Sequence, residues 1–432
     1  MTTKPSGGRR EGPSLSRSRP KVLLTGGRAP VALEMARLLA AAGCEVHVAE
    51  SLRYYLCRVS NAVASRTAVP APAIDPEGFL AGLEQVVRRE AIDWIVPTCE
   101  ELFYVSAGKE RLERLCRVFA APIGQLRRLH SKWSFIRRTE ELGFAVPATR
   151  LLADPSEWRD MMELSVDAPP ADKREREWPD GCVLKPAFSR SGTHVRFVKP
   201  RTDGDAGRPA ERARCGSRLP AESGYPWVAQ QYIRGRGLCT YSIVHEGRLT
   251  AHAAYAVTYA VPGGACYYFE PLRHPALMEW VSAFARLERF TGQLAFDFIE
   301  TDDGRLYPIE CNPRATSGLH LFGNGERIAD ALFDPDSLGG TIVEPQPSAS
   351  TMLALPMLAL GWRSGTAAGG WRTWLGKLAS ARDAVYRRDD PRPFFEQPLM
   401  LNELRRIARA RGRSIMEAMT ADIEWNGEGE WP

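Results

Sequence analysis

The chain has 432 residues, which is enough for two or three domains with a core each. Its composition, 44% hydrophobic and 25% charged, is that of an ordinary globular protein. The formal charge is +5, but residues 1–21 alone carry six basic side chains against one acidic side chain. The rest of the chain is therefore close to neutral, which argues against a nucleic-acid-binding body.

Residues 1–20 predict a disordered basic tail, because they are rich in Gly, Ser, Pro and Arg and lack the apolar core of a secretory signal. A transit peptide is the weaker alternative. No apolar run approaches the length of a membrane span, and the nine cysteines show neither a CxxC pair nor a disulfide framework. We therefore expect a cytoplasmic protein with core thiols, and neither nucleic acid nor a membrane among its partners.

Residues 21–125 predict a small doubly wound α/β domain. A strand over 21–25 ends in two glycines, and a helical pattern and a second strand follow it. The glycines do not extend into GxGxxG, since Pro30 stands where that fingerprint would continue. We therefore do not expect a nicotinamide site.

A later strand of this domain, over 94–97, ends beside the polar residues Thr98, Glu100 and Glu101. In open α/β sheets ligands gather outside the carboxyl ends of the strands. These side chains either bind a ligand there or cap the loop, and capping is the simpler interpretation.

A helix over 132–142 begins a second unit, which we expect to be α+β because its strands run antiparallel beside helices. The apolar strand 182–186 carries Lys185 near its end, and the polar loop 189–194 follows it. Ser189, Ser191 and Gly192 of that loop could cover phosphates, with Lys185 as a point charge. A charged hairpin tip is the alternative interpretation of the loop.

The residues over 293–314 predict a β-hairpin with a two-residue turn at Asp303-Gly304. That turn places Asp297 opposite Glu310, and Asn312 on the same face as Glu310. Opposed like charges destabilise a sheet by repulsion, whereas a divalent cation bound between them makes the pair stabilising. Hard oxygen ligands of this kind suit Mg²⁺. Solvated charge on an open sheet face is the alternative.

Taken together, Lys132, the strand 183–186, the segment 230–233 and the hairpin resemble the ATP-grasp superfamily over roughly residues 21–325. The chain is most similar to the carbamoyl phosphate synthetase and biotin carboxylase branch and to its stand-alone carboxylate–amine ligases. The resemblance implies that a two-lobed ATP-grasp domain at 126–340 follows the doubly wound domain. The small lobe would cover about 132–230 and the large lobe about 231–340.

The same resemblance implies the residues of the site. Lys132 and Lys185 would contact the phosphates of ATP, and Arg314 would face the transferred phosphoryl group or the substrate carboxylate, so that Lys185 and Arg314 are the catalytic pair. The adenine would lie against Gln230, Gln231, Tyr232 and Ile233, and Mg²⁺ or Mn²⁺ would bind Asp297, Glu310 and Asn312. One departure is that residues 234–238, RGRGL, contain no acid for the ribose.

The implied activity is ATP-dependent ligation of a small-molecule carboxylate to an amine, through an acyl phosphate, with release of ADP and phosphate. A non-catalytic ATP-binding sensor or scaffold is the alternative, and the formation of homo-oligomers is left open. Residues 255–273 are expected to line the acceptor pocket, with Tyr268 as a wall and Arg273 paired with the substrate carboxylate. Core packing is the alternative for the aromatic residues of that segment.

Residues 341–432 fall outside the resemblance and predict an appended helical extension. A basic helix over 401–411 would present its arginines either to an acidic partner or, more simply, to solvent.

Overall fold

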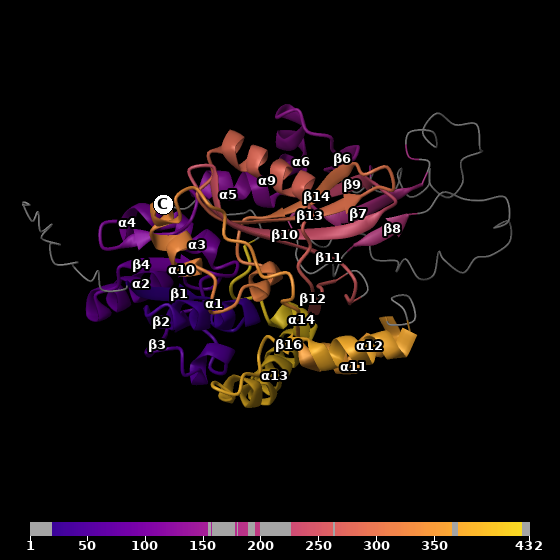
Figure 1. Cartoon of the computed structure of the whole chain (residues 1–432). Helices are drawn as coiled ribbons and strands as arrows, with labels where there is room; N and C mark the ends of the chain where they lie inside the picture. The colour runs from indigo at the N-terminus through magenta and orange to yellow at the C-terminus, as the bar shows by residue number, and fades with distance from the viewer. Residues whose placement is uncertain are drawn as a thin grey trace, which may run out of the picture.

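The computed structural model describes residues 20–153, 157, 178, 180–188, 195–198, 226–261, 264–364 and 370–425. Residues 1–19 of the predicted tail, and the predicted phosphate loop at 189–194, lie outside these ranges. Figure 1 shows the arrangement of the described elements, with the N-terminal sheet beside two antiparallel sheets.

The N-terminal domain is built on a five-stranded parallel sheet of order β3-β2-β1-β4-β5. Its parallel strands alternate with helices, as expected for a doubly wound domain. The elements are β1 (Lys21–Thr25), α1 (Pro30–Ala41), β2 (Glu45–Glu50), η1 (Leu56–Val59), β3 (Ser65–Ala68), α2 (Pro76–Glu90), β4 (Trp94–Pro97), α3 (Leu102–Ala107), α4 (Lys109–Leu112) and β5 (Arg117–Val118).

A smaller antiparallel sheet, of order β6-β9-β7-β8, follows the helices α5 (Ile123–His130) and α6 (Lys132–Glu141). Its strands are β6 (Thr149–Leu152), β7 (Cys182–Pro186), β8 (Arg196–Val198) and β9 (Trp227–Gln231). Ser131 caps α6 by accepting a hydrogen bond from the Ser134 amide, and the Lys132 amide donates to the Ala187 carbonyl, 2.9 Å away. The start of α6 is thereby fixed against the chain that leaves β7.

The larger antiparallel sheet has the order β11-β10-β13-β14. Its elements are β10 (Arg236–His245), β11 (Arg248–Ala256), α9 (Pro275–Glu288), β13 (Gly292–Glu300) and β14 (Leu306–Asn312). Phe284 of α9 and Phe135 of α6 both pack against Phe296 of β13, with ring centroids 5.1 and 5.8 Å apart. This shared core holds the smaller sheet's helix and the larger sheet together.

The β13–β14 turn differs from the sequence prediction. The loop has three residues, because the Thr301 amide donates to the Arg305 carbonyl and Gly304 takes a φ of +79°. That geometry shifts the first pairs by one residue, and Phe298 pairs with Pro308. A bulge then restores the register, so that Asp297 lies opposite Glu310 as predicted. Pro308 is tolerated because β14 is an edge strand.

The C-terminal residues form helices and two short strands. The strands β15 (Thr351–Met352) and β16 (Arg382–Asp383) join β12 (Tyr268–Phe269) in a small sheet. The helices of this half are η4 (Ser317–Leu321), α10 (Ile328–Phe333), η5 (Pro335–Leu338), α11 (Ala354–Ser364), α12 (Gly370–Ser380), α13 (Arg392–Arg411) and α14 (Ile415–Ala418). Among the described residues, no helix has the length and apolar character needed to cross a membrane.

Candidate active site

Two carboxylates face each other across β13 and β14. Asp297 and Glu310 are directly opposed in the antiparallel pair. Burial, reinforced by the charge of Glu310, raises the pKa of Asp297 to about 6. Two buried carboxylates that repel one another are stabilised by a cation, so the pair is suited to bind one.

Two buried lysines approach the same carboxylates from the smaller sheet and its helix. Lys132, 3% exposed at the start of α6, lies with its Nζ 3.4 Å from Oε2 of Glu310. The Nζ of Lys185, near the end of β7, donates to Gln230 Oε1 at 2.9 Å and to the Ile309 carbonyl at 3.0 Å. Burial lowers the pKa of Lys185 to about 8. Burial alone would raise the pKa of Glu310, but Lys132 and Lys185 outweigh it and lower that pKa.

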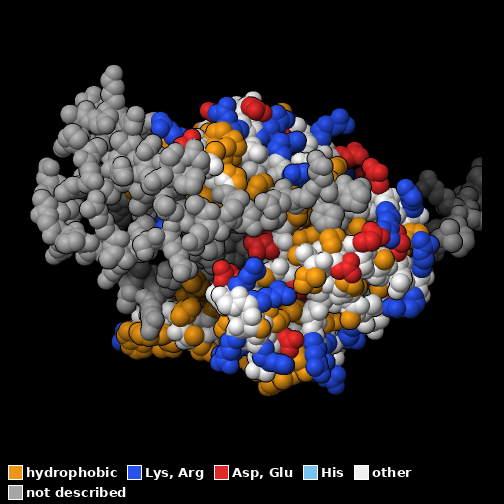
Figure 2. Space-filling view, turned by 180° about the vertical axis from the view of Figure 1, so that it is seen from behind, with side chains coloured by type: hydrophobic (Ala, Val, Ile, Leu, Met, Phe, Trp, Pro, Cys, Tyr) orange, Lys and Arg blue, Asp and Glu red, His pale blue; other side chains and the backbone are white. Residues whose placement is uncertain are grey.

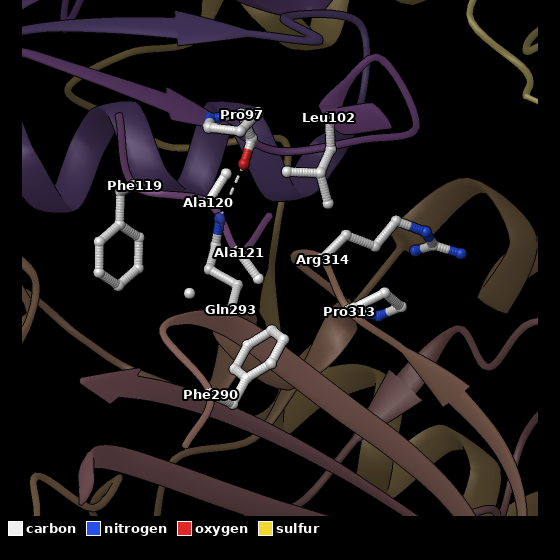
Figure 3. A pocket seen from close by; sticks show the side chains of 10 residues that line it. Pro97, Leu102, Phe119, Ala120, Ala121, Phe290, Gln293, Pro313 and Arg314 are labelled. Atoms are coloured by element: carbon white, nitrogen blue, oxygen red, sulfur yellow. Dashed lines mark hydrogen bonds between the residues drawn. The ribbon is translucent and has the colours of Figure 1, made fainter. Parts of the chain in front are cut away.

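Asn312 and Arg314 continue the cluster beyond Glu310. The Asn312 Nδ2 donates to Glu310 Oε1 at 3.2 Å, and Arg314 Nη2 donates to Asn312 Oδ1 at 3.0 Å. Arg314 is one of the residues that line a small hollow, and Figure 3 shows its guanidinium directed away from Gln293. In that hollow the Gln293 side-chain amide donates to the Pro97 carbonyl at 2.8 Å, which joins the larger sheet to the N-terminal domain.

The structure thus brings together the predicted metal ligands Asp297, Glu310 and Asn312. Within the described ranges no cluster of three or more His, Cys, Asp and Glu side chains could hold a metal ion. The predicted set has only two carboxylates and an amide. That donor set fits Mg²⁺, which typically uses one or two protein carboxylates and completes its shell with water and nucleotide phosphates.

The predicted adenine segment borders an open groove of about 390 Å³. Gln231, Tyr232 and Ile233 line one side, and the turn between β13 and β14 lines the other. Gln230 does not line this groove but holds Lys185. The groove also carries three acids that the sequence analysis did not assign, namely Asp180, Asp302 and Asp303. They come from two segments far apart in sequence, so no local motif marks them.

The segment 234–238 contains no acid, but its two arginines form ion pairs with acids from other segments. Arg234 pairs with Asp180 through an Nη2–Oδ1 distance of 2.6 Å, and Arg236 forms an ion pair with Glu300. Each arginine therefore meets a carboxylate from another strand or loop.

The predicted acceptor residues Tyr268 and Arg273 differ in their surroundings. Tyr268 is 1% exposed and packs in a core cluster with Tyr259, Met352 and Met357. This position matches the core-packing alternative rather than an open wall. Arg273 is exposed. Roles of Tyr268 and Arg273 in substrate binding, and of Ser189, Ser191 and Gly192 in phosphate binding, stay predictions; the last three residues lie outside the described ranges.

Two further side chains reach the site. Glu100, 1% exposed after β4, lies with Oε1 3.9 Å from Nε of Arg314, so one of the three polar residues after that strand faces the cluster. Its neighbour Glu101 instead accepts hydrogen bonds from the Thr98 and Cys99 amides, both at 3.0 Å, as a loop cap does. Cys239 lies opposite Asp297 in β10, and its thiol acts to lower the pKa of that carboxylate, against the larger raising effect of burial. The sequence placed Cys239 in a strand but gave no indication that it lies beside Asp297.

The fold is that of ATP-grasp proteins, as comparison with solved structures shows. An L-amino acid ligase from Bacillus licheniformis has a TM-score of 0.55 and 14% identity, covering 77% of this chain and 79% of its own. N5-carboxyaminoimidazole synthetase from Staphylococcus aureus has a TM-score of 0.55 and 13% identity, covering 80% and 86%. The biotin carboxylase domain of Hydrogenobacter thermophilus 2-oxoglutarate carboxylase, solved with the magnesium salt of ADP, has a TM-score of 0.53 and 13% identity, covering 74% and 70%.

Comparison by sequence gives no match. No family model and no curated protein sequence matches the chain.

Proposed function

We propose that the chain is an ADP-forming ligase that joins a small-molecule carboxylate to an amine or another nucleophile. The observation that carries this proposal is the opposed pair Asp297 and Glu310, flanked by the buried Lys132 and Lys185. Two carboxylates and two ammonium groups in a desolvated site suit a metal-bound triphosphate, in which positive and negative charges alternate.

The nucleotide would extend from the groove to the carboxylate pair. Thr301, which lines the groove directly after β13, is four residues from Asp297, or about 13 Å at the rise of a strand. That span suits ATP with its adenine beside Tyr232 and Ile233 and its phosphates at Lys132 and Lys185. The acids that line the groove, Asp180, Asp302 and Asp303, would accept the ribose hydroxyls in place of the missing acid in 234–238.

Asp297, Glu310 and Asn312 are the residues that would hold Mg²⁺ or Mn²⁺. Such an ion, when bound, neutralises phosphate charge and orients the phosphates for in-line transfer. Asn312 also orients Glu310 and Arg314 through its two side-chain hydrogen bonds.

The reaction would run in two steps. An oxygen of the substrate carboxylate attacks the γ-phosphorus, the bond to the β-phosphate oxygen breaks, and ADP leaves. The amine then attacks the acyl carbon of the acyl phosphate, the C–O bond breaks, and phosphate leaves with the oxygen it gained. The protein needs no nucleophile of its own, and Lys185 and Arg314 offset the charge that develops on the moving phosphoryl group.

The test is Glu310→Gln, which keeps the shape of the side chain and removes its charge. We expect release of ADP, stimulated by the right substrate from a panel of carboxylates and amines, to fall about 100-fold or more. The control is Glu84→Gln on α2, whose carboxylate pairs with Arg111 away from the site, and this variant should turn over normally. Retained turnover in a folded Glu310→Gln protein would overturn the proposal. Tight ATP binding with no turnover across the panel would indicate a sensor instead.

A further inference from the structure

The residues that follow α14 are bonded to the N-terminal domain at two points. Arg28, in the loop after β1, donates from Nη1 to the Met419 carbonyl at 2.9 Å. The Tyr104 hydroxyl of α3 donates to the Glu424 carbonyl, also at 2.9 Å. The next side chain, that of Trp425, is thereby brought onto α3, where it is only 3% exposed.

Burial sets Trp425 apart from two other tryptophans of the C-terminal half. Trp362 and Trp371 are 52% and 63% exposed, and Figure 2 shows the hydrophobic side chains of α11 and α12 along the lower edge of the molecule. The indole N–H of Trp425 meets no hydrogen-bond acceptor within the described residues. The Arg127 guanidinium lies over its ring, 5.3 Å from the centroid. Packing of the ring therefore holds this side chain in place.

Trp425 closes a ring of four aromatic side chains. It stacks on Phe103 at a centroid distance of 5.0 Å and meets Phe188 edge-on at 5.7 Å. His130 completes the ring, 4.8 Å from Phe103 and 6.0 Å from Phe188. Each aromatic group therefore lies beside two others, and aromatic pairs at such distances attract each other beyond the burial of their apolar area.

Each of the other three rings stands two or three residues from a polar side chain of the candidate site. The pairs are Phe103 and Glu100, His130 and Lys132, and Phe188 and Lys185. The Lys132 amide also donates to the Ala187 carbonyl at 2.9 Å, so the segments that carry the two lysines are bonded to each other. Without the indole of Trp425, the rings of Phe103 and Phe188 would both lose a packing partner.

We propose that Trp425 is a positioning residue for the nucleotide, which holds Lys132 and Lys185 at the places where they meet the phosphates of ATP. The inference rests on the nucleotide site of the proposed function and adds to it a residue from the C-terminal half. Replacing a buried indole by a methyl group leaves a cavity into which neighbouring rings shift. A shift of about 1 Å in a charged group is enough to lose much of its effect on a bound ligand.

The experiment is calorimetric titration of the full chain with ATP and Mg²⁺, well below the thermal midpoint of every variant. Trp425→Ala should raise the Kd for ATP about tenfold or more. Trp425→Phe keeps an aromatic ring and loses an N–H that has no acceptor among the described residues. It should therefore bind ATP within about threefold of the unchanged protein.

The matched control is Trp94→Ala. Trp94 stands at the start of β4, opposite to the end of the strand that leads to Glu100. Its ring also lies under an arginine, Arg117 at 5.1 Å, and beside an aromatic ring, Phe333 at 5.2 Å. Its loss should lower the thermal midpoint and leave the Kd for ATP unchanged, which separates positioning from a general loss of stability.

Three results would overturn the inference. One is an equal Kd for ATP in the unchanged protein and in folded Trp425→Ala. Another is an equal rise of the Kd in Trp425→Ala and Trp94→Ala, because any loss of packing would then weaken the site. The third is an unchanged protein that binds no ATP, which would overturn the nucleotide site as well. ATP binding without turnover, with the expected order of the variants, would contradict the ligase alone and support the role of Trp425.

Discussion

Lys185 is a buried cation, so water does not stabilise its charge. Its Nζ is held by Gln230 and by the Ile309 carbonyl, and its pKa falls to about 8. A nucleotide phosphate would restore the lost stabilisation. We therefore expect Lys185→Met to weaken ATP binding about tenfold or more, measured by calorimetry. The control Lys109→Met removes a lysine that also donates to a carbonyl, that of Ala120, away from the site, and should bind ATP normally.

We expect Glu100 to act indirectly, by positioning Arg314. Its carboxylate lies 3.9 Å from the Arg314 Nε, which meets no hydrogen-bond acceptor within the described part of the chain. Glu100→Gln should lower kcat about tenfold while leaving the KM for ATP unchanged, since Arg314 is placed to act on the transferred group. Steady-state kinetics with each substrate varied in turn makes the distinction. Equal changes in both KM values would show a general structural role instead.

At the scale of the element, β10 and β11 support the strand that carries Asp297. Ser242 and His252 are paired across these strands, with Oγ and Nδ1 2.9 Å apart. Burial lowers the pKa of His252 from 6.5 to about 4. Between these two pH values His252 is protonated in the unfolded chain and neutral in the folded chain. The free energy of unfolding therefore falls as the pH drops from about 6.5 towards about 4.

The stability lost through His252 should approach about 3 kcal/mol. His252→Gln should remove that part of the acid sensitivity, and urea unfolding at pH values across this window measures it. An unchanged slope of stability against pH in the variant would rule out His252 as its source.

The hairpin β13–β14 shows what sequence could and could not predict. The Asp297–Glu310 pairing was correct although the predicted turn was wrong, because the three-residue loop and the bulge before Glu310 shift the register in opposite directions. Alternating apolar residues and the glycine mark the strands, so their existence was predictable. Ile309, the unpaired residue of the bulge, accepts a hydrogen bond at its carbonyl from Lys185 of another sheet, and no residue pattern within the hairpin encodes that contact.

The whole molecule is joined by ion pairs that no local pattern encodes. Residues 382–422 were predicted as part of an appended extension, yet they complete the core of the N-terminal domain. Arg28, 2% exposed, donates from Nη2 to Asp422 Oδ2 at 2.8 Å, and Arg37 donates from Nε to Asp390 at 2.9 Å. The buried Glu34 of α1 meets Arg382 and Arg387. Partners more than 300 residues apart come together only in the folded chain.

These pairs make the C-terminal residues part of the stability of the first domain. Asp422→Asn should destabilise the protein by about 3 kcal/mol, because it leaves the buried Arg28 short of a counter-charge. The control Asp336→Asn alters a pair with Arg248 in which the aspartate is 92% exposed, and should cost less than about 1 kcal/mol. Denaturant unfolding compares the two. Equal small effects would show that Glu50 alone satisfies Arg28.

The central claim, that this chain makes an acyl phosphate, is tested most directly by the fate of the carboxylate oxygens. The carboxylate that stimulates release of ADP is labelled with oxygen-18, the reaction is run with the amine in unlabelled water, and the phosphate is examined by mass spectrometry. Transfer of the γ-phosphoryl group to the carboxylate predicts one labelled oxygen in each phosphate released. Phosphate without the label, formed at the same rate as ADP, would mean that water attacked ATP and would contradict the account.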